Sequence, residues 1–336
     1  MKAATGNLTC DRKRGAALVV VMWVLLIVSL IVSSFAFEMQ LEARIISARR
    51  KRFKADQLAL AGIELVKTML AFKEETPGDN LIYEDALLNK AVQLQEGTPV
   101  SYSEQLGDGT INVNVDYERG RRNLHKLSMD DWHELFDQAG IPNVEWDSLL
   151  GCLTDWEDEN DTHQLSGAES DDFFYRQAGY ECKNAPVDTI DELLLIKGWT
   201  PEILYGTPAE EVTEYQISGI ARHLTTWGDG MINPNSASRE VLNSLNIAVE
   251  IVDAILEARL GADGEEGTDD DGITAEDLVS LGLDTSLFTL TPEYITIVSQ
   301  GTVGDLTSTI SSVFKLGGRE PSPLFWLEGE EDALSR

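Results

Sequence analysis

The sequence contains few of the residue types on which common catalytic sites depend. Its four histidines, His125, His133, His163 and His223, are scattered singly along the chain. There is no Gly-x-Ser-x-Gly turn, no phosphate-binding glycine loop and no paired-histidine zinc motif. Because no nucleophile and base can be named, we expect that the protein is not an enzyme.

Basic residues are scarce as well. The 336 residues include 26 Lys and Arg against 58 Asp and Glu, which gives a net charge of −32. A surface this acidic repels nucleic acid and anionic lipid headgroups. It also repels itself, so the composition favours bound cations.

Cysteine is limited to Cys10, Cys152 and Cys182. A disulfide between Cys152 and Cys182 would suit an oxidising compartment. It would close a loop of about 31 residues and stabilise the fold by about 3 to 4 kcal/mol through loss of chain entropy in the unfolded state. Two free, buried thiols are the alternative.

What the sequence does have is a long apolar run near its N-terminus. Residues 16–37 carry no charge and follow the basic stretch Arg12-Lys13-Arg14-Gly15. At about 1.5 Å per residue, a helix of this length crosses a bilayer core of about 30 Å. A secretory signal has a shorter apolar core, with its cleavage site beyond that core. Here Gly15 and Ala16 precede the run, so cleavage between them would remove residues 1–15 and keep the helix; a plain signal-anchor helix is the alternative.

The rest of the chain predicts an α+β protein. Residues 38–72 contain no proline and place apolar side chains at helical spacing, so we expect the helix to continue through them. Four further segments follow from periodicity and composition: a short helix and a β-hairpin in residues 73–127, a large helical domain in 128–286, two returning strands in 287–318, and a flexible tail in 319–336.

The helical domain contains an internal repeat. Residues 185–194 align without gaps with residues 233–242, and each copy predicts a capped helix, a tight turn and a second helix. The expected N-caps in this domain are Ser128, Asp188 and Ser236.

Helix-hairpin-helix units of this kind bind DNA phosphates in other proteins. Here Lys197 is the only base in the first turn, and the second turn has none. We therefore interpret the two hairpins as a packing scaffold. A membrane-tethered DNA-uptake protein is the alternative function.

One stretch has the chemistry of a site. Residues 155–172 contain eight carboxylates and a Gly-containing loop, and hard oxygen ligands of this kind suit Ca²⁺, which takes six to eight of them. A solvated acidic loop is the alternative. A second acidic segment, residues 263–272, fails as an EF-hand because loop positions 1 and 12 would be Gly267 and Leu278. We expect a linker there.

The N-terminal pattern resembles a known family. A basic leader ending in Gly15 is similar to the type III signal of type IV pilins and type II secretion pseudopilins, in which a prepilin peptidase cuts after the glycine and methylates the new terminus. Most such proteins carry Glu at the fifth mature residue, where this chain has Val20. A missing Glu is typical of K-type minor pseudopilins, the general secretion pathway protein K family. The resemblance extends to residues 119–124, to residues 230–238, and to the acidic Asp-Trp and Gly-Ala-Glu motifs.

The resemblance implies a location and a function. It implies one pass through the bacterial inner membrane, a periplasmic pilin-type sheet, and an inserted helical domain. It also implies a subunit that caps the tip of the type II secretion pseudopilus and helps to start its assembly, for protein export across the outer membrane. The implied partners are I-type and J-type minor pseudopilins, the inner-membrane assembly platform and prepilin peptidase, with no nucleic acid.

The resemblance also implies calcium in the helical domain. The positions that match the motif are Asp155, Asp158, Asn160, Asp161, Glu169 and Asp172. Removal of the leader would take Cys10 with it and leave the other two cysteines as a pair.

Overall fold

The computed structural model describes residues 12–71, 86–95, 97–208, 216–264, 268, 271–317 and 321–329. The chain divides into two compact units, residues 1–54 and residues 55–336, and each is described by itself. Most of the proposed leader, residues 1–11, lies outside the described residues, as do residues 330–336 of the predicted tail.

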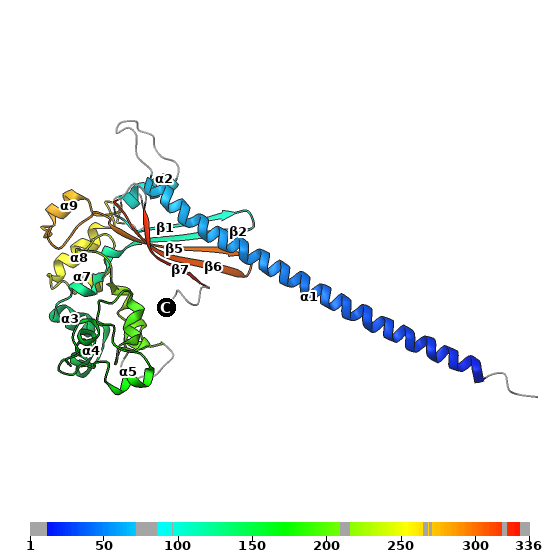
Figure 1. The fold of residues 1–336 in the computed structure, drawn as a ribbon. Coiled ribbons are helices and arrows are strands. Elements are labelled where there is room, and N and C mark those ends of the chain that lie inside the picture. The colour runs from blue at the N-terminus through cyan, green and yellow to red at the C-terminus, as the bar shows by residue number, and fades with distance from the viewer. Residues whose placement is uncertain are drawn as a thin grey trace, which may run out of the picture. The chain divides into compact units, whose positions relative to one another are not determined.

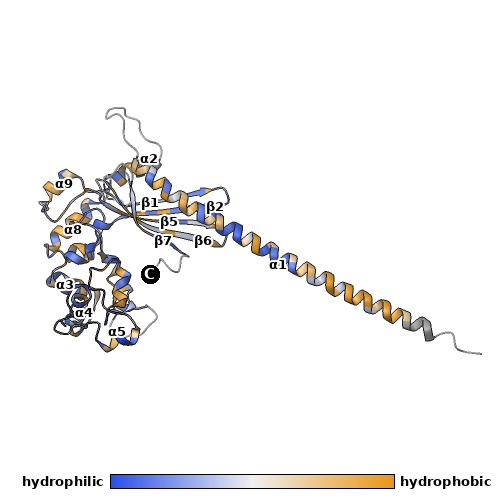
Figure 2. Cartoon of the chain, viewed as in Figure 1, coloured by the Kyte–Doolittle hydropathy of each residue, from blue (hydrophilic) through white to orange (hydrophobic). Residues whose placement is uncertain are grey.

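The first unit contains most of helix α1 (Arg12–Ala71), and the side chains of residues 17–50 are exposed. Within α1, an 18-residue window of mean hydropathy 2.8 has none of its residues buried, and in the described part of the chain this is the one helix apolar enough to span a membrane. Figure 2 shows the corresponding apolar stretch of α1. Large side chains such as Trp23 and Phe35 are each 62 % exposed, which water disfavours and a lipid environment does not. The long helix that the sequence predicts is confirmed, and it ends at Ala71.

The second unit is built on a five-stranded sheet with the order β1-β2-β5-β6-β7. The strands are β1 (Val100–Leu106), β2 (Gly109–Tyr117), β5 (Tyr294–Val303), β6 (Leu306–Lys315) and β7 (Ser322–Gly329), and every neighbouring pair is antiparallel. The first two strands form the predicted hairpin, and β5 and β6 are the predicted returning strands. The α+β class is therefore confirmed.

The last part of α1 packs on one face of this sheet, as Figure 1 shows. Ile63 and Val66 of the helix lie in one core with Ile111, Val113 and Val115, which alternate along β2. Gly62 is required at the contact, because a Cβ there would lie 2.1 Å from the hydroxyl of Ser299. The apolar side chains that alternate along β2 and those at helical spacing on α1 thus pack together in one apolar layer.

The flexible tail predicted for residues 319–336 is wrong for residues 322–329. These residues form β7, which pairs with β6 and has a register shift beside Phe314. Pro321 and Pro323 suggested a loose end, but an edge strand tolerates proline because one side of its backbone needs no ladder partner. The apolar sequence Leu324-Phe325-Trp326-Leu327 then supplies the strand.

The helical part contains α3 (Met129–Ala139), α4 (Asn143–Glu157), α5 (Phe173–Ala178), α6 (Pro201–Tyr205), α7 (Arg239–Asn243), α8 (Val249–Ala258) and α9 (Ala275–Ser280). Helix α2 (Ala86–Gln95) corresponds to the short helix predicted before the hairpin. Two apolar cores result, one around Trp132, Phe136 and Trp199 and one around Leu242 and Ile255. A short parallel pair, β3 (Arg122–Asn123) with β4 (Leu224–Thr225), also lies in this part.

One of the three predicted helix caps is confirmed. Ser128 forms a capping box with Asp131 at the start of α3. Asp188 is not a cap, because its carboxylate pairs with Lys183 at 2.7 Å, and Thr189 precedes the 3₁₀ helix η3 (Ile190–Leu195) in its place.

The third predicted cap, Ser236, is also wrong, because Ser238 caps α7 by accepting a bond from the amide of Val241. The first hairpin therefore pairs the 3₁₀ helix η3 with α6, whereas the second pairs α7 with α8. The two copies share a sequence pattern, but the first helix is a 3₁₀ helix in one copy and an α-helix in the other.

The junction turn, residues 118–122, joins the sheet to the helices. Glu118 is 3 % exposed and accepts hydrogen bonds from the hydroxyls of Thr225 and Thr296. Arg121 adds an ion pair to Glu118 at 3.1 Å. Because these partners come from β4 and β5, a single buried carboxylate connects both parts of the second unit.

Two further arginines of the junction turn, Arg119 and Arg122, connect it to other parts of the second unit. Arg119 pairs with Asp229 at 2.8 Å and with Glu293 at 2.6 Å. Arg122 pairs with Asp131 of α3 at 2.8 Å and donates to the carbonyl of Ser244 at 2.7 Å.

Candidate functional site

Two buried carboxylates mark the acidic loop, residues 155–172. Asp155 lies in the last turn of α4 and is 0 % exposed; its Oδ1 accepts a bond from the amide of Gln164 at 2.8 Å. Its Oδ2 is buried without a hydrogen-bond partner, and so are both carboxylate oxygens of Glu169, which is 2 % exposed. A buried, unpaired carboxylate is costly unless a proton or a cation compensates it.

The backbone brings this loop close to α4. Asp158 is the C-cap that follows α4, and its Oδ1 accepts a hydrogen bond from the amide of Asn160 at 3.1 Å. A Cβ on Gly167 would lie 2.1 Å from Asp155 Oδ2, and a Cβ on Gly151 would lie 3.0 Å from the amide nitrogen of Gly167. Only glycine at these two positions lets the returning chain approach the carboxylate so closely.

The negative charges of neighbouring carboxylates in the loop raise the pKa values of Asp155 and Glu169. Burial raises the pKa of Glu169, and the charges of Asp155, Asp158 and Asp161 raise this pKa further. Burial also raises the pKa of Asp155, to which Asp158 adds a further increase. A divalent cation would replace this mutual repulsion with attraction.

The donor atoms of this loop suit a hard cation, because they are carboxylate oxygens and three of them are buried without a hydrogen-bond partner. Calcium is the cation that a flexible set of oxygen ligands suits best. Within the described residues, however, no three His, Cys, Asp or Glu side chains already stand together as a ligand set. The loop would have to close further around an ion, and calcium stays a prediction.

The six predicted ligands do not share one environment. Asp155 and Glu169 are buried, and Asp158 is half-buried. Asn160 and Asp161 are exposed; Asn160 accepts the amide of Thr162 at 2.8 Å, and Asp161 accepts from Asn184 at 3.4 Å.

The sixth predicted ligand, Asp172, has another role. It caps α5 by accepting the amide of Phe174 at 2.8 Å, and its other oxygen accepts from Lys197 at 2.8 Å. The bond from Lys197 is the main reason that the pKa of Asp172 is lowered.

The sequence reasoning missed two features of the acidic loop. His163 is exposed, and its ring pairs with Asp171 at 2.8 Å. Leu165 is 94 % exposed and Phe173 is 71 % exposed, although both are large and apolar. The available signal was an apolar residue next to a glycine turn and another directly after a helix cap.

Cys152 and Cys182 are free and buried in the structure, which corresponds to the second of the two alternatives left open by the sequence. The sulfur of Cys152 lies 3.8 Å from the carbonyl oxygen of Ser166, and that of Cys182 lies 3.6 Å from the carbonyl oxygen of Ala168. Burial raises the pKa of the Cys152 thiol to about 11. Both thiols therefore contact the backbone of the same loop, and each is directed to a different carbonyl.

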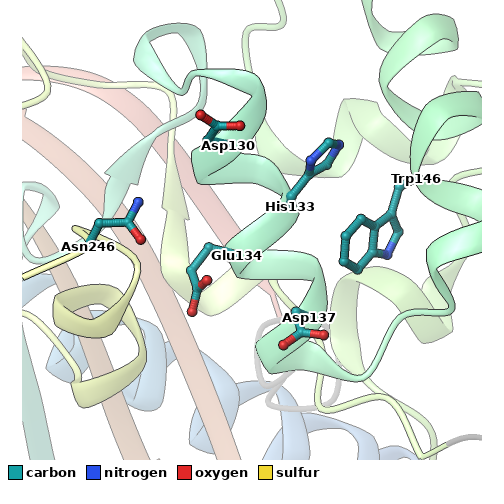
Figure 3. Close-up of a pocket in the computed structure, with 6 residues that line it drawn as sticks. All are labelled: Asp130, His133, Glu134, Asp137, Trp146 and Asn246. Atoms are coloured by element: carbon teal, nitrogen blue, oxygen red, sulfur yellow. The ribbon is translucent and has the colours of Figure 1, made fainter. Parts of the chain in front are cut away.

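A separate shallow pocket of about 390 Å³ lies between α3, α4 and the turn after α7. Figure 3 shows His133 directed toward Trp146, and the two rings stack with centroids 5.1 Å apart. The other lining residues are Asp130, Glu134, Asp137 and Asn246. The lining contains no Ser, Cys or Lys that could act as a nucleophile.

The two hairpin turns offer little positive charge for DNA phosphates. Lys197 donates to Asp172, so its ammonium group is already engaged within the domain. The turn of the second hairpin contains Asn246 at φ 54° in place of a base. These contacts are consistent with a packing role.

At the N-terminus, Gly15 and Ala16 lie within α1, next to the start of the apolar run. Val20, the position that the resemblance singles out, is 61 % exposed. Residues 17–37 contain no carboxylate.

Comparisons with known proteins agree with these features. Residues 109–206 match the family described as type II secretion system (T2SS), protein K. A search of curated proteins gave no significant match.

The fold is similar to a chain in the crystal structure of the GspK-GspI-GspJ complex from the enterotoxigenic Escherichia coli type 2 secretion system. The TM-score is 0.56 at 16 % identity, over 85 % of this chain and 99 % of the other. The match of residues 109–206 supports a minor pseudopilin of the type II secretion system protein K family, and the similar solved chain shares the α+β fold.

Proposed function

We propose that this minor pseudopilin caps the tip of the pseudopilus and helps to start its assembly, with its second unit in the periplasm. The observation that carries the proposal is Val20 in the exposed apolar segment of α1, residues 17–37, which contains no carboxylate. A carboxylate in the apolar layer costs about 2.5 to 3.5 kcal/mol unless it is paired. In shaft subunits its partner would be the terminal amine of the subunit ahead, and a tip subunit has none ahead.

The partners follow from the same proposal. The solved structure with a similar fold is a complex of GspK with GspI and GspJ. We therefore infer that I-type and J-type minor pseudopilins join this chain at the tip. Prepilin peptidase would cut after Gly15, and the assembly platform of the inner membrane would receive the processed helix.

Calcium would act in the helical domain as a structural ion. Asp155 and Glu169 would supply the buried oxygens, and Asp158, Asn160 and Asp161 lie on the same loop to complete the shell. The cation would link the end of α4 to the segment that carries Glu169, without any role in catalysis.

Val20→Glu tests the tip proposal. A capping subunit gains nothing from this carboxylate, so we expect secretion to stay equal or fall and the variant to remain absent from the shaft. Val24→Glu, placed four residues further along α1, controls for the cost of a charge in the apolar layer. Secretion assays, immunolabelling of pseudopili and mass spectrometry of the terminus at Ala16 are the measurements. A Val20→Glu variant that secretes better and appears along the shaft would contradict capping.

A further inference from the structure

Leu165 and Phe173 are large apolar side chains that lie mostly in solvent. Their exposed fractions are 94 % and 71 %, the highest among the described leucine, phenylalanine and tryptophan side chains of residues 55–336. Leaving such side chains in water is unfavourable, and within the described residues the fold leaves both largely uncovered. Leu165 lies in the acidic loop, and Phe173 follows this loop directly as the first residue of α5.

The loop holds Leu165 in this position. The turn around it closes with a bond from the amide of Gly167 to the carbonyl of Gln164 at 3.0 Å. The amide of Gln164 is bound to Asp155 at 2.8 Å, and the carbonyl of Leu165 lies against Gly151 of α4. The backbone is fixed on the protein side, while the side chain lies in solvent.

Phe173 is held in a comparable way. It is the first residue of α5, directly after the cap Asp172, which is bound to Lys197. Its position is set by the helix start and by this ion pair. Both apolar side chains are therefore exposed although the backbone that carries them is held in place by contacts.

Leu165 and Phe173 lie on two limbs of one loop that a side-chain contact joins. His163 and Asp171 are joined at 2.8 Å, which brings the two limbs of the loop together. Leu165 follows His163 by two residues, and Phe173 follows Asp171 by two residues. Each Cα is therefore within about 7 Å of the Cα of its neighbour in this pair. We call Leu165, Phe173 and the exposed carboxylates around them the 165–173 surface.

The charge of the 165–173 surface defines its occupant. Glu159, Asp161 and Asp171 are exposed on the same loop. Of the nearby bases, Lys197 is paired with Asp172, and Arg176 is exposed on α5 three residues after Phe173, so the exposed acids outnumber the exposed base. Acidic segments and anionic lipid surfaces would be repelled. We propose that the 165–173 surface is a docking site for a protein segment in which an apolar side chain lies beside Lys or Arg. This inference requires neither the tip position nor a bound cation, because the contacts that hold the turn and the helix cap are made by the protein alone.

The test begins with site-specific photo-crosslinking in the full chain, within an assembled secretion system. A photo-crosslinking amino acid is placed at position 165, at position 173 or, as a control, at Val279, which is 77 % exposed on α9. We expect positions 165 and 173 to label the same protein, at a peptide that carries Lys or Arg near an apolar residue. Labelling should fall with added salt. No adduct, an acidic peptide, a lipid adduct, or equal labelling from position 279 would overturn the proposal.

The second step measures affinity with the cross-linked peptide as the probe. The full chain in detergent should lose at least tenfold in affinity when it carries Leu165→Ser with Phe173→Ser. The pair Val144→Ser with Val279→Ser, at exposed sites elsewhere, is the matched control and should leave affinity unchanged. Equal affinity of the wild type and the Leu165→Ser, Phe173→Ser variant would overturn the assignment. Melting curves of both variants should match the wild type, because the replaced side chains contact mainly solvent.

Discussion

The junction turn and the acidic loop both bury carboxylates, in opposite ways. At the junction turn, Glu118 has a hydroxyl on each oxygen and Arg121 beside it. In the acidic loop, one oxygen of Asp155 and both of Glu169 are buried without partners. The first site is complete with groups from the chain, whereas the second leaves room for charge from outside. Burial of an acid therefore indicates a binding site only when its oxygens lack donors.

The largest expected effect is at the junction turn. Glu118→Ala leaves Arg121 and the hydroxyls of Thr225 and Thr296 without their buried partner. We expect the free energy of unfolding to fall by about 3 to 5 kcal/mol. Urea unfolding of the full chain in detergent measures it. Glu104→Ala, at an exposed acid on β1, should change stability by less than about 0.5 kcal/mol.

Measuring Glu118→Ala with and without calcium tests whether the junction turn and the acidic loop are independent. Since the junction turn needs no outside charge, the loss in Glu118→Ala should be the same in chelator and in calcium. A loss that calcium restores would mean that the two sites are one electrostatic unit, and it would break the distinction.

The next effect concerns the acidic loop. Calcium that binds only the folded state at 100 times its Kd should add about 2.7 kcal/mol to the free energy of unfolding. Magnesium should add less, because it needs a tighter octahedral shell and gives up water reluctantly. Melting curves in chelator, magnesium and calcium give the measurement. Identical curves in chelator and calcium would show that the loop is a solvated acidic surface.

Two variants separate ligands from other acids of the loop. Asp155→Asn with Glu169→Gln should abolish the calcium response, because both unpartnered carboxylates are neutralised. Asp172→Asn should keep the response and lose some stability without calcium, because this residue binds Lys197 and caps α5. If Asp172→Asn removes the calcium response as well, Asp172 is a ligand after all.

The difference between these sites also shows what sequence reasoning can reach. The apolar run, the alternation on β2 and the density of acids in residues 155–172 are local patterns, and each predicted its element or loop. The pairing of Asp172 with Lys197 and the bonds of Glu118 to β4 and β5 join residues far apart in the chain. Spacing along the chain does not contain these contacts, so the roles of Asp172 and Glu118 could not be predicted.

The errors at β7 and at the helix caps have a similar cause. Pro321 and Pro323 are turn formers by local preference, but β6 offers the segment a ladder that overrides this preference. Asp188 is a good cap by type, yet Lys183 takes its carboxylate. In each case a tertiary partner decided between two structures that are locally allowed.

The smallest expected effect extends the comparison to a buried base. His223 is 5 % exposed; its Nε2 accepts a bond from Arg222 at 3.0 Å, and its Nδ1 lies 3.2 Å from the hydroxyl of Ser238. Burial, followed by the charge of Arg222, lowers the pKa of His223 below its ordinary value of 6.5. The folded state therefore stays neutral where the unfolded chain binds a proton. Stability is full above about pH 6.5 and falls as the pH drops toward the lowered pKa of the folded state.

His223→Gln should remove this contribution, which amounts to about 1.4 kcal/mol for each unit by which the pKa is lowered. The measurement is the free energy of unfolding between about pH 5 and pH 8, with calcium present throughout so that the acidic loop contributes equally. His163→Gln, which replaces an exposed histidine, is the control. In this variant the free energy of unfolding should change with pH as it does in the wild type, because His223 is intact. If His223→Gln and the wild type lose stability in parallel as the pH falls, His223 takes up its proton as readily in the fold as in the unfolded chain, and its bonds to Arg222 and Ser238 do not hold it neutral.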